Sequence, residues 1–257
     1  MFIVAVNSPG SAGKVPGLFD AFVAVKRLIA DKEDTSQVFT ILEALGKRSS
    51  EKSWKKFKKH PNYSMLREQP PLMNFLCDKK WLSSLPEGSL GRHYYEFLQR
   101  ENISAEGLVE ASEKGFSGLR PLADETVEFH QRQRDAHDLW HVLTGYGRDA
   151  LGELCLLAVT YRLLGNPGLL LIILFGGRHI KKLNPGFKFW SAIGEGFRHG
   201  RQMSWLPGVD WKEVLPRPID EARSMLNIQT PAIYQDVVES TLKQGGIHFD
   251  EQLSAAE

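Results

Sequence analysis

The segment HDLWHVLTGYGRDALGE, residues 137–153, places two histidines and two carboxylates around a glycine-containing turn. His137 and His141 are four residues apart, so a helix would bring both imidazoles to one face, one turn apart. Helical HExxH sites use this spacing to bind one metal ion. Asp138 would point about 100° away from His137 on an ideal helix. From there it could reach the ion, orient a ligand or hold a metal-bound water.

Glu153 follows a break in the helical pattern at Gly145 and Gly147. On one continuous helix it would point roughly 160° away from His137, so the chain must reverse for the carboxylate to return. The two glycines allow that reversal, and Asp149 is a suitable N-cap for the next helix. The sequence therefore predicts a helix-turn-helix pair carrying one metal site, with His137, Asp138, His141 and Glu153 as ligands.

Mixed nitrogen and oxygen ligands favour Zn²⁺, Fe²⁺ or Mn²⁺, and the carboxylates leave Mg²⁺ open. The alternative is that two helical histidines are ordinary half-buried or surface groups. Arg134 could bind a substrate anion or pair with Asp138, and an ordinary surface salt bridge is the other interpretation. Tyr146 lies in the predicted turn and is a candidate substrate contact.

Helical periodicity continues on both sides of this segment, and sustained β-branched alternation is absent beyond the first six residues. The sequence therefore predicts a mainly α protein, a single helical domain over residues 1–257 with flexible ends at 1–14 and 245–257. A polar loop is expected over 102–118. The expected helices cover residues 15–30, 37–45 (ending at Gly46), 72–85, 90–98 (capped by Ser89), 124–144 and 150–164, with a last amphipathic helix around 222–226.

Two segments suggest contact with a membrane surface. Residues 47–62 are strongly basic and carry Trp54 and Phe57, which favours attachment to anionic lipid or a solvated helix with inward aromatics. Residues 154–175 are apolar, but Arg162 and the 166–168 break leave each half short of the ~20 residues needed to span a bilayer. Two buried or partly membrane-facing helices are expected there. The basic group at 178–182 could contact lipid headgroups or a phosphate, or solvate a helix end.

Composition excludes several classes of protein. Lys and Arg total 32 against 31 Asp and Glu, so the chain lacks the basic excess of a nucleic-acid binder. Cys77 and Cys155 form no CxxC pair, which predicts two reduced thiols and neither a disulfide framework nor a cysteine-rich zinc site. The N-terminus has no recognisable signal or transit peptide, which favours a cytoplasmic chain.

Several motifs together resemble the coenzyme Q (ubiquinone) biosynthesis protein 4 family. They are HDxxH followed by eleven residues and Glu153, LPEGSLGRHYYEFL at 85–98, DTSQVFTILEALG at 34–46, RxxHD from Arg134, and EARSMLNI at 221–228. The resemblance extends from about residue 17 to 228. It implies an all-helical fold and metal ligands at His137, Asp138, His141 and Glu153.

The resemblance also implies oxidative decarboxylation at C1 of a prenylated hydroxybenzoate, which would leave a hydroxyl group. The expected partners are this polyprenylated quinone precursor, other quinone-biosynthesis proteins, the inner face of the cell membrane of a bacterium, and a second copy of the chain. The apolar runs 154–164 and 169–175 could wall a channel for the prenyl tail or be ordinary core.

Two other functions stay open. The first is a non-catalytic polyprenyl-lipid-binding scaffold that organises a quinone-biosynthesis complex and has a structural metal. The second is a metal-dependent hydrolase, which HDxxH suggests by its likeness to HExxH. The hydrolase ranks last because Asp138 is one methylene shorter than the glutamate base of that motif.

Overall fold

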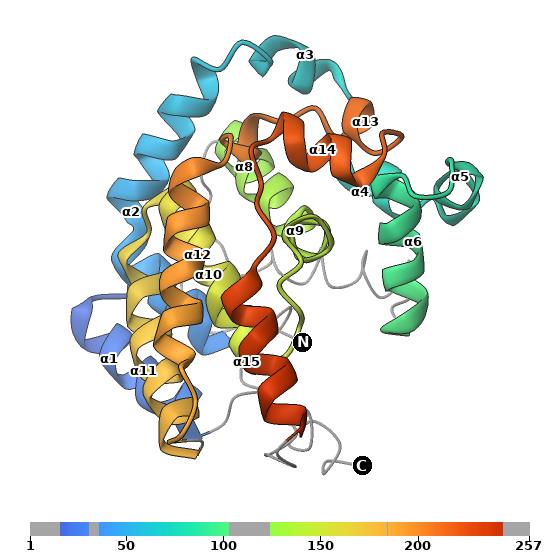
Figure 1. Ribbon diagram of the computed structural model, residues 1–257. Helices are drawn as coiled ribbons and strands as arrows, with labels where there is room; N and C mark the ends of the chain where they lie inside the picture. The colour runs from blue at the N-terminus through green and yellow to red at the C-terminus, as the bar shows by residue number, and fades with distance from the viewer. Residues whose placement is uncertain (1–15, 31–35, 103–123, 184, 244–257) are drawn as a thin grey trace.

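The computed structural model describes residues 16–30, 36–102, 124–183 and 185–243. Within these ranges the regular elements are helices, as Figure 1 shows, and the prediction of a mainly α, all-helical single domain is confirmed. The ends predicted to be flexible, 1–14 and 245–257, lie outside the described residues. So does nearly all of the polar loop predicted at 102–118.

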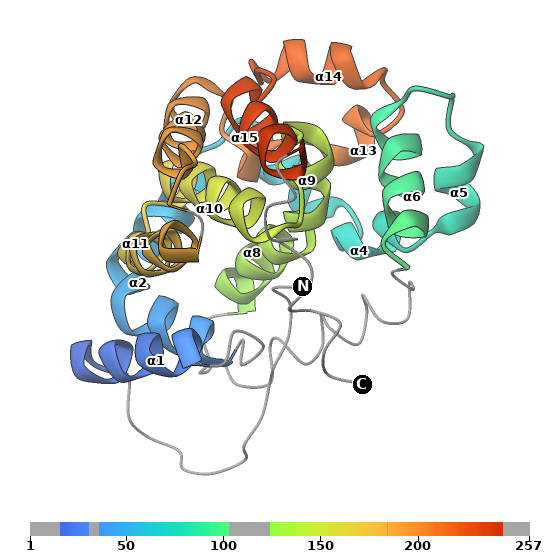
Figure 2. The same ribbon diagram turned by 60° about the horizontal axis from the view of Figure 1, so that its bottom comes forward.

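Two helices near the N-terminus form one side of the molecule together with a helix from the middle of the chain. α1 (Leu18–Ala30) packs on α2 (Ser36–Lys58) and α11 (Pro167–Leu183). Figures 1 and 2 both show the three helices side by side. Their apolar faces form a small core of their own, whose buried members are Ala24, Val25, Leu28, Ile41 and Ile172.

The helix predicted to end at Gly46 continues as α2 to Lys58, so the predicted end is wrong. A Cβ on Gly46 would lie 2.3 Å from the side-chain nitrogen of Asn166. That nitrogen donates to the carbonyl oxygen of Leu42, 3.2 Å away. Gly46 therefore lets α2 approach the loop around Asn166 closely, at a modest cost in helix propensity.

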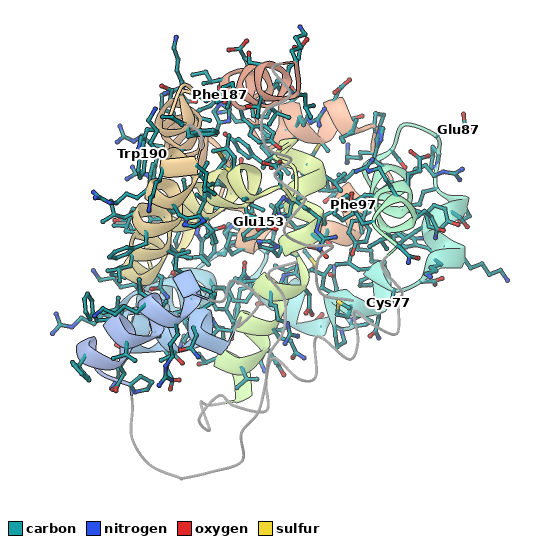
Figure 3. All side chains as sticks on the ribbon, turned by 90° about the horizontal axis from the view of Figure 1, so that it is seen from below. Cys77, Glu87, Phe97, Glu153, Phe187 and Trp190 are labelled. Atoms are coloured by element: carbon teal, nitrogen blue, oxygen red, sulfur yellow. The ribbon has the colours of Figure 1, made fainter. Side chains whose placement is uncertain are left out.

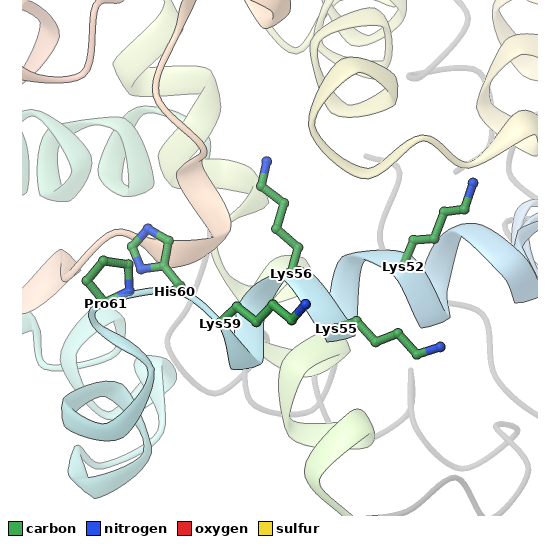
Figure 4. A pocket seen from close by; sticks show the side chains of 6 residues that line it. All are labelled: Lys52, Lys55, Lys56, Lys59, His60 and Pro61. Carbon is green, nitrogen blue, oxygen red and sulfur yellow. The ribbon is translucent and has the colours of Figure 1, made fainter.

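The basic end of α2 buries its aromatic residues. Phe57 and Trp54 contact Phe129 and other rings in a separate aromatic cluster. This arrangement, with Phe57 buried and Trp54 half-buried, agrees with a solvated helix that has inward aromatics. Attachment of this segment to a membrane stays a prediction. Four lysines of the same segment line a hollow on the outer surface with His60 and Pro61 (Figure 4); they are Lys52, Lys55, Lys56 and Lys59.

A central pair of helices, α10 (Ala150–Leu164) and α12 (Phe189–Gln202), organises the main core. Gly196 allows their close contact, because a Cβ there would lie 2.5 Å from the carbonyl oxygen of Cys155. α11 packs against α10, and α15 (Ala232–Lys243) packs against α12. Glu153, near the start of α10, is almost fully buried in this region (Figure 3).

Short helices form the other side of the core, as Figure 1 shows. They are α3 (Tyr63–Glu68), α4 (Leu72–Leu76), α5 (Lys79–Ser84), α6 (Leu90–Arg100), η1 (Leu206–Gly208), α13 (Trp211–Val214) and α14 (Ile219–Met225). The single helix predicted over 72–85 is wrong, because Asp78 accepts a hydrogen bond from the Trp81 N–H and starts a new helix. Ser89 caps α6 as predicted.

The apolar segment 154–175 forms parts of two helices, α10 and α11, as predicted. The break between them lies at 165–166 rather than at 166–168, because Pro167 and Gly168 belong to α11. Among the described residues, no helix is both long and apolar enough to cross a bilayer. The C-terminal part differs from the prediction. The helix expected to be last is α14, and α15 follows it unforeseen.

Candidate metal centre

Two helices and the turn between them position the predicted ligands. The helix predicted over 124–144 is divided at Ala136 into α8 (Asp124–Asp135) and α9 (His137–Thr144). α9 ends at Gly145, whose φ of 77° lies in the left-handed region that favours glycine. Asp149 then caps α10, with its Oδ1 accepting from the N–H groups of Leu151 and Gly152. The predicted helix-turn-helix pair is therefore present.

The turn returns Glu153 to the two histidines. Its Oε1 lies 3.4 Å from Nε2 of His141, and its Oε2 lies 3.9 Å from Nε2 of His137. The two imidazole ring centroids are 4.8 Å apart. Possible ligand atoms of His137, Asp138 and His141 all lie within 4.8 Å of one another. The structure thus brings together the four residues that the sequence predicted.

Burial and unsatisfied polar atoms test whether this group fits a cation. Asp138, His141 and Glu153 are buried, and His137 is partly exposed. Among the described residues, Nδ1 of His137, Nε2 of His141 and Oε2 of Glu153 have no hydrogen-bond partner. Buried polar atoms are normally hydrogen-bonded, so three such atoms in one cluster are unusual. Two imidazoles and two carboxylates are also common metal ligands, and the residues fit a divalent metal.

The ligand cluster is electrostatically coupled. Burial alone would raise the pKa of Asp138, but His137 and His141 hold that pKa below its ordinary value. Burial also opposes ionisation of Glu153, yet His141 and then His137 lower its pKa. For His141, burial is outweighed by Glu153 and the Tyr146 carbonyl, and the pKa is raised. Ionised carboxylates are therefore available beside the imidazoles, as a cation site requires.

Tyr146 is buried in the turn, and its carbonyl oxygen lies 2.9 Å from Nδ1 of His141. Its hydroxyl lies 3.1 Å from Nδ1 of His199, and burial raises the pKa of that hydroxyl. Arg134 pairs with Asp135 at 2.9 Å rather than with Asp138. Substrate binding by Arg134 and Tyr146 stays a prediction, and both residues lie within a few positions of the ligands in the sequence.

Sequence reasoning missed three residues around the site. Arg148 favours ionisation of Asp138 and pairs with Glu101 at 3.5 Å. Tyr234 donates its hydroxyl hydrogen to Asp149. Glu195 accepts from the N–H groups at the start of α15. Only Glu195 carries a signal in the sequence, since it is the first acidic residue after Glu153 and follows forty-one residues without one, 154–194.

The two apolar runs after Glu153 are largely packed in the interior. Leu154, Leu156 and Val159 belong to the main core, and Ile172 belongs to the core shared with α1 and α2. This packing agrees with the interpretation of these residues as ordinary core. A channel for a prenyl tail along them stays a prediction.

Comparisons with known proteins identify similar chains. A family model described as "Coenzyme Q (ubiquinone) biosynthesis protein Coq4" matches residues 21–232, which include the four candidate ligands. "Ubiquinone biosynthesis protein COQ4, mitochondrial" of Podospora anserina is 30% identical over 172 residues, covering 65% of this chain and 53% of that protein. The protein of the same description from Scheffersomyces stipitis is 28% identical over 168 residues, covering 65% and 50%. The chain thus spans about half the length of these curated relatives.

A solved structure supports the fold. The crystal structure of a "Putative ubiquinone biosynthesis protein" from Nostoc punctiforme superimposes with a TM-score of 0.61. The match covers 82% of this chain and 98% of that chain, at 22% sequence identity. The arrangement of helices described above is therefore shared with an experimentally determined protein.

Proposed function

This chain belongs to the Coq4 family of coenzyme Q (ubiquinone) biosynthesis proteins, and from that membership we propose that it acts in ubiquinone biosynthesis. The observation that carries the proposal is the convergence of two imidazoles and two carboxylates from α9 and α10. A buried, polar cluster of this kind is typical of a site of chemistry, because a hydrophobic core gains nothing from holding it.

The proposed reaction is oxidative decarboxylation at C1 of a prenylated hydroxybenzoate. The ring loses its carboxyl group as CO₂ and gains a hydroxyl, which is a two-electron oxidation. The proposed oxidant is O₂, which is reduced to H₂O₂ while water supplies the hydroxyl oxygen. A divalent cation would supply Lewis-acid stabilisation of the charge that develops as CO₂ departs; Zn²⁺, Fe²⁺ or Mn²⁺ is favoured and Mg²⁺ is open.

The chain's own residues would hold that cation and orient the substrate. His137 and His141 offer neutral nitrogen donors, and Asp138 and Glu153 offer charged oxygens. The His137 side chain is 19% exposed against 1% for His141, so the substrate head group would approach from the His137 side. Arg134 lies three residues before His137 and is the proposed partner for the substrate's carboxylate. Tyr146 is the second proposed contact.

The alternative is a non-catalytic scaffold that binds a polyprenyl lipid and organises other quinone-biosynthesis proteins. In that case the metal would hold α9 against α10 and would perform no chemistry. The leucines next to Glu153 do not distinguish the enzyme from the scaffold, because they would be buried both in a wall that binds a prenyl tail and in an ordinary core. The effect of removing one candidate ligand, Glu153, separates the two.

We also propose peripheral attachment to an anionic membrane through α11 and the start of α12. Four large apolar side chains are exposed there: Leu170, Leu174, Leu183 and Trp190. Leu170 and Leu174 lie one turn apart on the same face of α11, and Gly177 lies one turn further along. The Trp190 ring packs on Gly177, because a Cβ there would meet the ring. Leu170, Leu174 and Trp190 therefore form one apolar stripe. In Figure 3 Trp190 lies at the edge of the molecule, away from Glu153.

Charge around this stripe matches an anionic surface. Arg178, Lys182 and Lys188 are exposed beside it, and residues 154–194 contain no acidic side chain. Apolar side chains rimmed by basic ones are typical of helices that lie in the membrane interface. The membrane face that we propose for this attachment is the inner face of the cell membrane.

Elemental analysis of the purified protein tests the metal site. We expect about one equivalent of a divalent metal, lost in the His137→Ala, His141→Ala double variant and retained in His93→Ala, whose histidine side chain is 41% exposed and lies on α6. Iron or manganese would favour the oxidative reaction, and zinc or magnesium would leave both functions open. Absence of metal from the native protein, even after reconstitution, would overturn the metal site and favour the scaffold.

A further inference from the structure

One peptide group in the turn is hydrogen-bonded at both ends. The carbonyl oxygen of Tyr146 lies 2.9 Å from Nδ1 of His141. The N–H of the same peptide group, which belongs to Gly147, donates to the hydroxyl oxygen of Tyr234 at 2.9 Å. The orientation of this one plane therefore decides where the acceptor for the His141 ring lies.

The Tyr234 hydroxyl also connects the turn to the second ligand helix. It donates its hydrogen to Oδ2 of Asp149, while the other oxygen of Asp149 caps α10. The backbone carbonyl of Asp149 accepts from the N–H of Glu153 at 2.9 Å. A chain of hydrogen bonds thus runs from the ring of His141, through the peptide plane and the hydroxyl, to the residue that starts the Glu153 helix. Successive bonds of this kind polarise one another.

The position of Tyr234 is itself fixed by buried groups. The carboxylate of Glu195, on α12, accepts from the N–H groups of Ile233 and Tyr234 at 3.1 and 3.0 Å. The Tyr234 ring packs edge-to-face on Tyr146, with centroids 5.4 Å apart. Gly147 leaves room for the hydroxyl, because a Cβ there would lie 2.5 Å from it. These contacts together fix the position of the Tyr234 hydroxyl.

We propose that Tyr234 is a positioning residue for the metal ligand His141, acting through the 146–147 peptide group. The inference rests on the proposed metal site. A ligating histidine is normally held by a hydrogen bond from its other ring nitrogen, and loss of such support typically weakens metal binding by about 10–100-fold. Here the acceptor is a backbone carbonyl, and Tyr234 holds that carbonyl in place from a helix near the far end of the chain.

The test compares two variants of α15 by titration with Co²⁺, which reports both affinity and ligand geometry. Tyr234→Phe removes the hydroxyl and keeps the ring. Thr241→Val is the matched control, because it removes another buried hydroxyl of the same helix, whose one bond within the described part of the chain is to the carbonyl of Val237. We expect Tyr234→Phe to bind Co²⁺ about 10–100-fold more weakly with an altered ligand-field absorption spectrum. Thr241→Val should match the native protein in both.

Gly147→Ala provides a second route to the same result. Its φ is not positive, so the backbone accepts alanine, but the new Cβ would displace the Tyr234 hydroxyl and approach Oδ2 of Asp149 to 2.8 Å. We expect weaker Co²⁺ binding here as well. Native affinity and spectrum in Tyr234→Phe would overturn the positioning role while leaving the metal site intact. Equal weakening in Thr241→Val would overturn it as well, since loosening of α15 would suffice. Absence of Co²⁺ binding by the native protein would overturn the site and the inference together.

Discussion

His141 donates its Nδ1 hydrogen to the carbonyl oxygen of Tyr146, 2.9 Å away in the turn after α9. A carbonyl can only accept, so this bond keeps the hydrogen on Nδ1. In the neutral ring the lone pair then lies on Nε2, which is 3.4 Å from Glu153. The turn that reverses the chain thus also selects the tautomer that a metal at this position needs.

Glu153→Gln separates an enzyme from a scaffold. The amide keeps the size of the side chain and removes a charged candidate ligand. Loss of a group that only hydrogen-bonds to a ligand typically weakens metal binding by about 10–100-fold, so loss of a ligand should weaken it at least as much. An enzyme should lose turnover and keep its fold and its lipid. A scaffold with a structural metal should lose thermal stability or partner binding instead. The measurements are metal content, melting temperature and conversion of a prenylated hydroxybenzoate.

Glu96→Gln is the control for this change, because its carboxylate is exposed on α6 and, among the residues that the structure describes, pairs with Arg92 and His93 of its own helix alone. It should resemble the native protein in every measurement. If Glu153→Gln leaves metal content, stability and turnover unchanged, the metal interpretation is wrong.

The convergence of the four candidate ligands could be predicted from sequence because they lie within seventeen residues, where helical periodicity and two glycines determine the geometry. The groups that support them could not. Tyr234 is 87 residues from the Gly147 amide with which it bonds, and nothing local marks it. α15 escaped prediction for a related reason. Its first N–H groups are capped by Glu195 on another helix, which no local pattern indicates. Thr230 and Pro231 directly before it are a local helix-start signal that the prediction overlooked.

Gly46 shows why helix ends were less predictable than helix faces. A glycine after an apolar run is a common stop signal, but here it lies within α2 and faces Asn166. The distinction depends on a residue 120 positions away in the chain. The start of α5 at Asp78, in contrast, depends on a local contact. Asp78 accepts from the N–H of Trp81, three residues later, and aspartate is a common N-cap residue, so this start could have been predicted.

Two glycines of α12 should respond oppositely to alanine. A Cβ on Gly196 would lie 2.5 Å from the carbonyl oxygen of Cys155, so Gly196→Ala must push α12 away from α10. We expect a loss of about 1–3 kcal/mol in the free energy of unfolding. Gly194 has no atom within 4 Å of the same position, and Gly194→Ala should stabilise by up to about 1 kcal/mol. Urea unfolding of both variants measures the difference, and equal effects would contradict the close packing.

His130 should make stability depend on pH. Burial lowers the pKa of His130, whose Nε2 lies 2.5 Å from the Ser50 hydroxyl. In the unfolded chain the pKa of His130 has its ordinary value of about 6.5, so the unfolded state binds a proton at a higher pH than the folded state does. The contribution of His130 to the free energy of unfolding should therefore be fully present above a pH of about 6.5. It should decrease below that pH, by at most about 1.4 kcal/mol per pH unit. His130→Gln should show a shallower loss than the native protein between pH 7.5 and 5.5 in urea unfolding, and an equal loss would contradict the shift.

Leu174→Glu should weaken attachment to anionic vesicles. Leu174 is 49% exposed in the middle of the apolar stripe of α11, and a carboxylate there both removes apolar contact and repels anionic lipid. Burying a leucine is worth about 1.5–3 kcal/mol, so binding should fall about tenfold or more. Co-sedimentation with phosphatidylcholine vesicles, with and without phosphatidylglycerol, measures the affinity.

Met225→Glu is the matched control, because Met225 is 47% exposed on α14, in another part of the molecule. It should bind vesicles like the native protein. Neutralising Lys55, Lys56, Lys58 and Lys59 tests the basic end of α2 separately, and a loss there alone would move the attachment surface to that helix. Light scattering after size exclusion decides the remaining outcome. If Leu174→Glu dissociates a dimer and leaves vesicle binding intact, the stripe is covered by a second copy of the chain rather than by lipid.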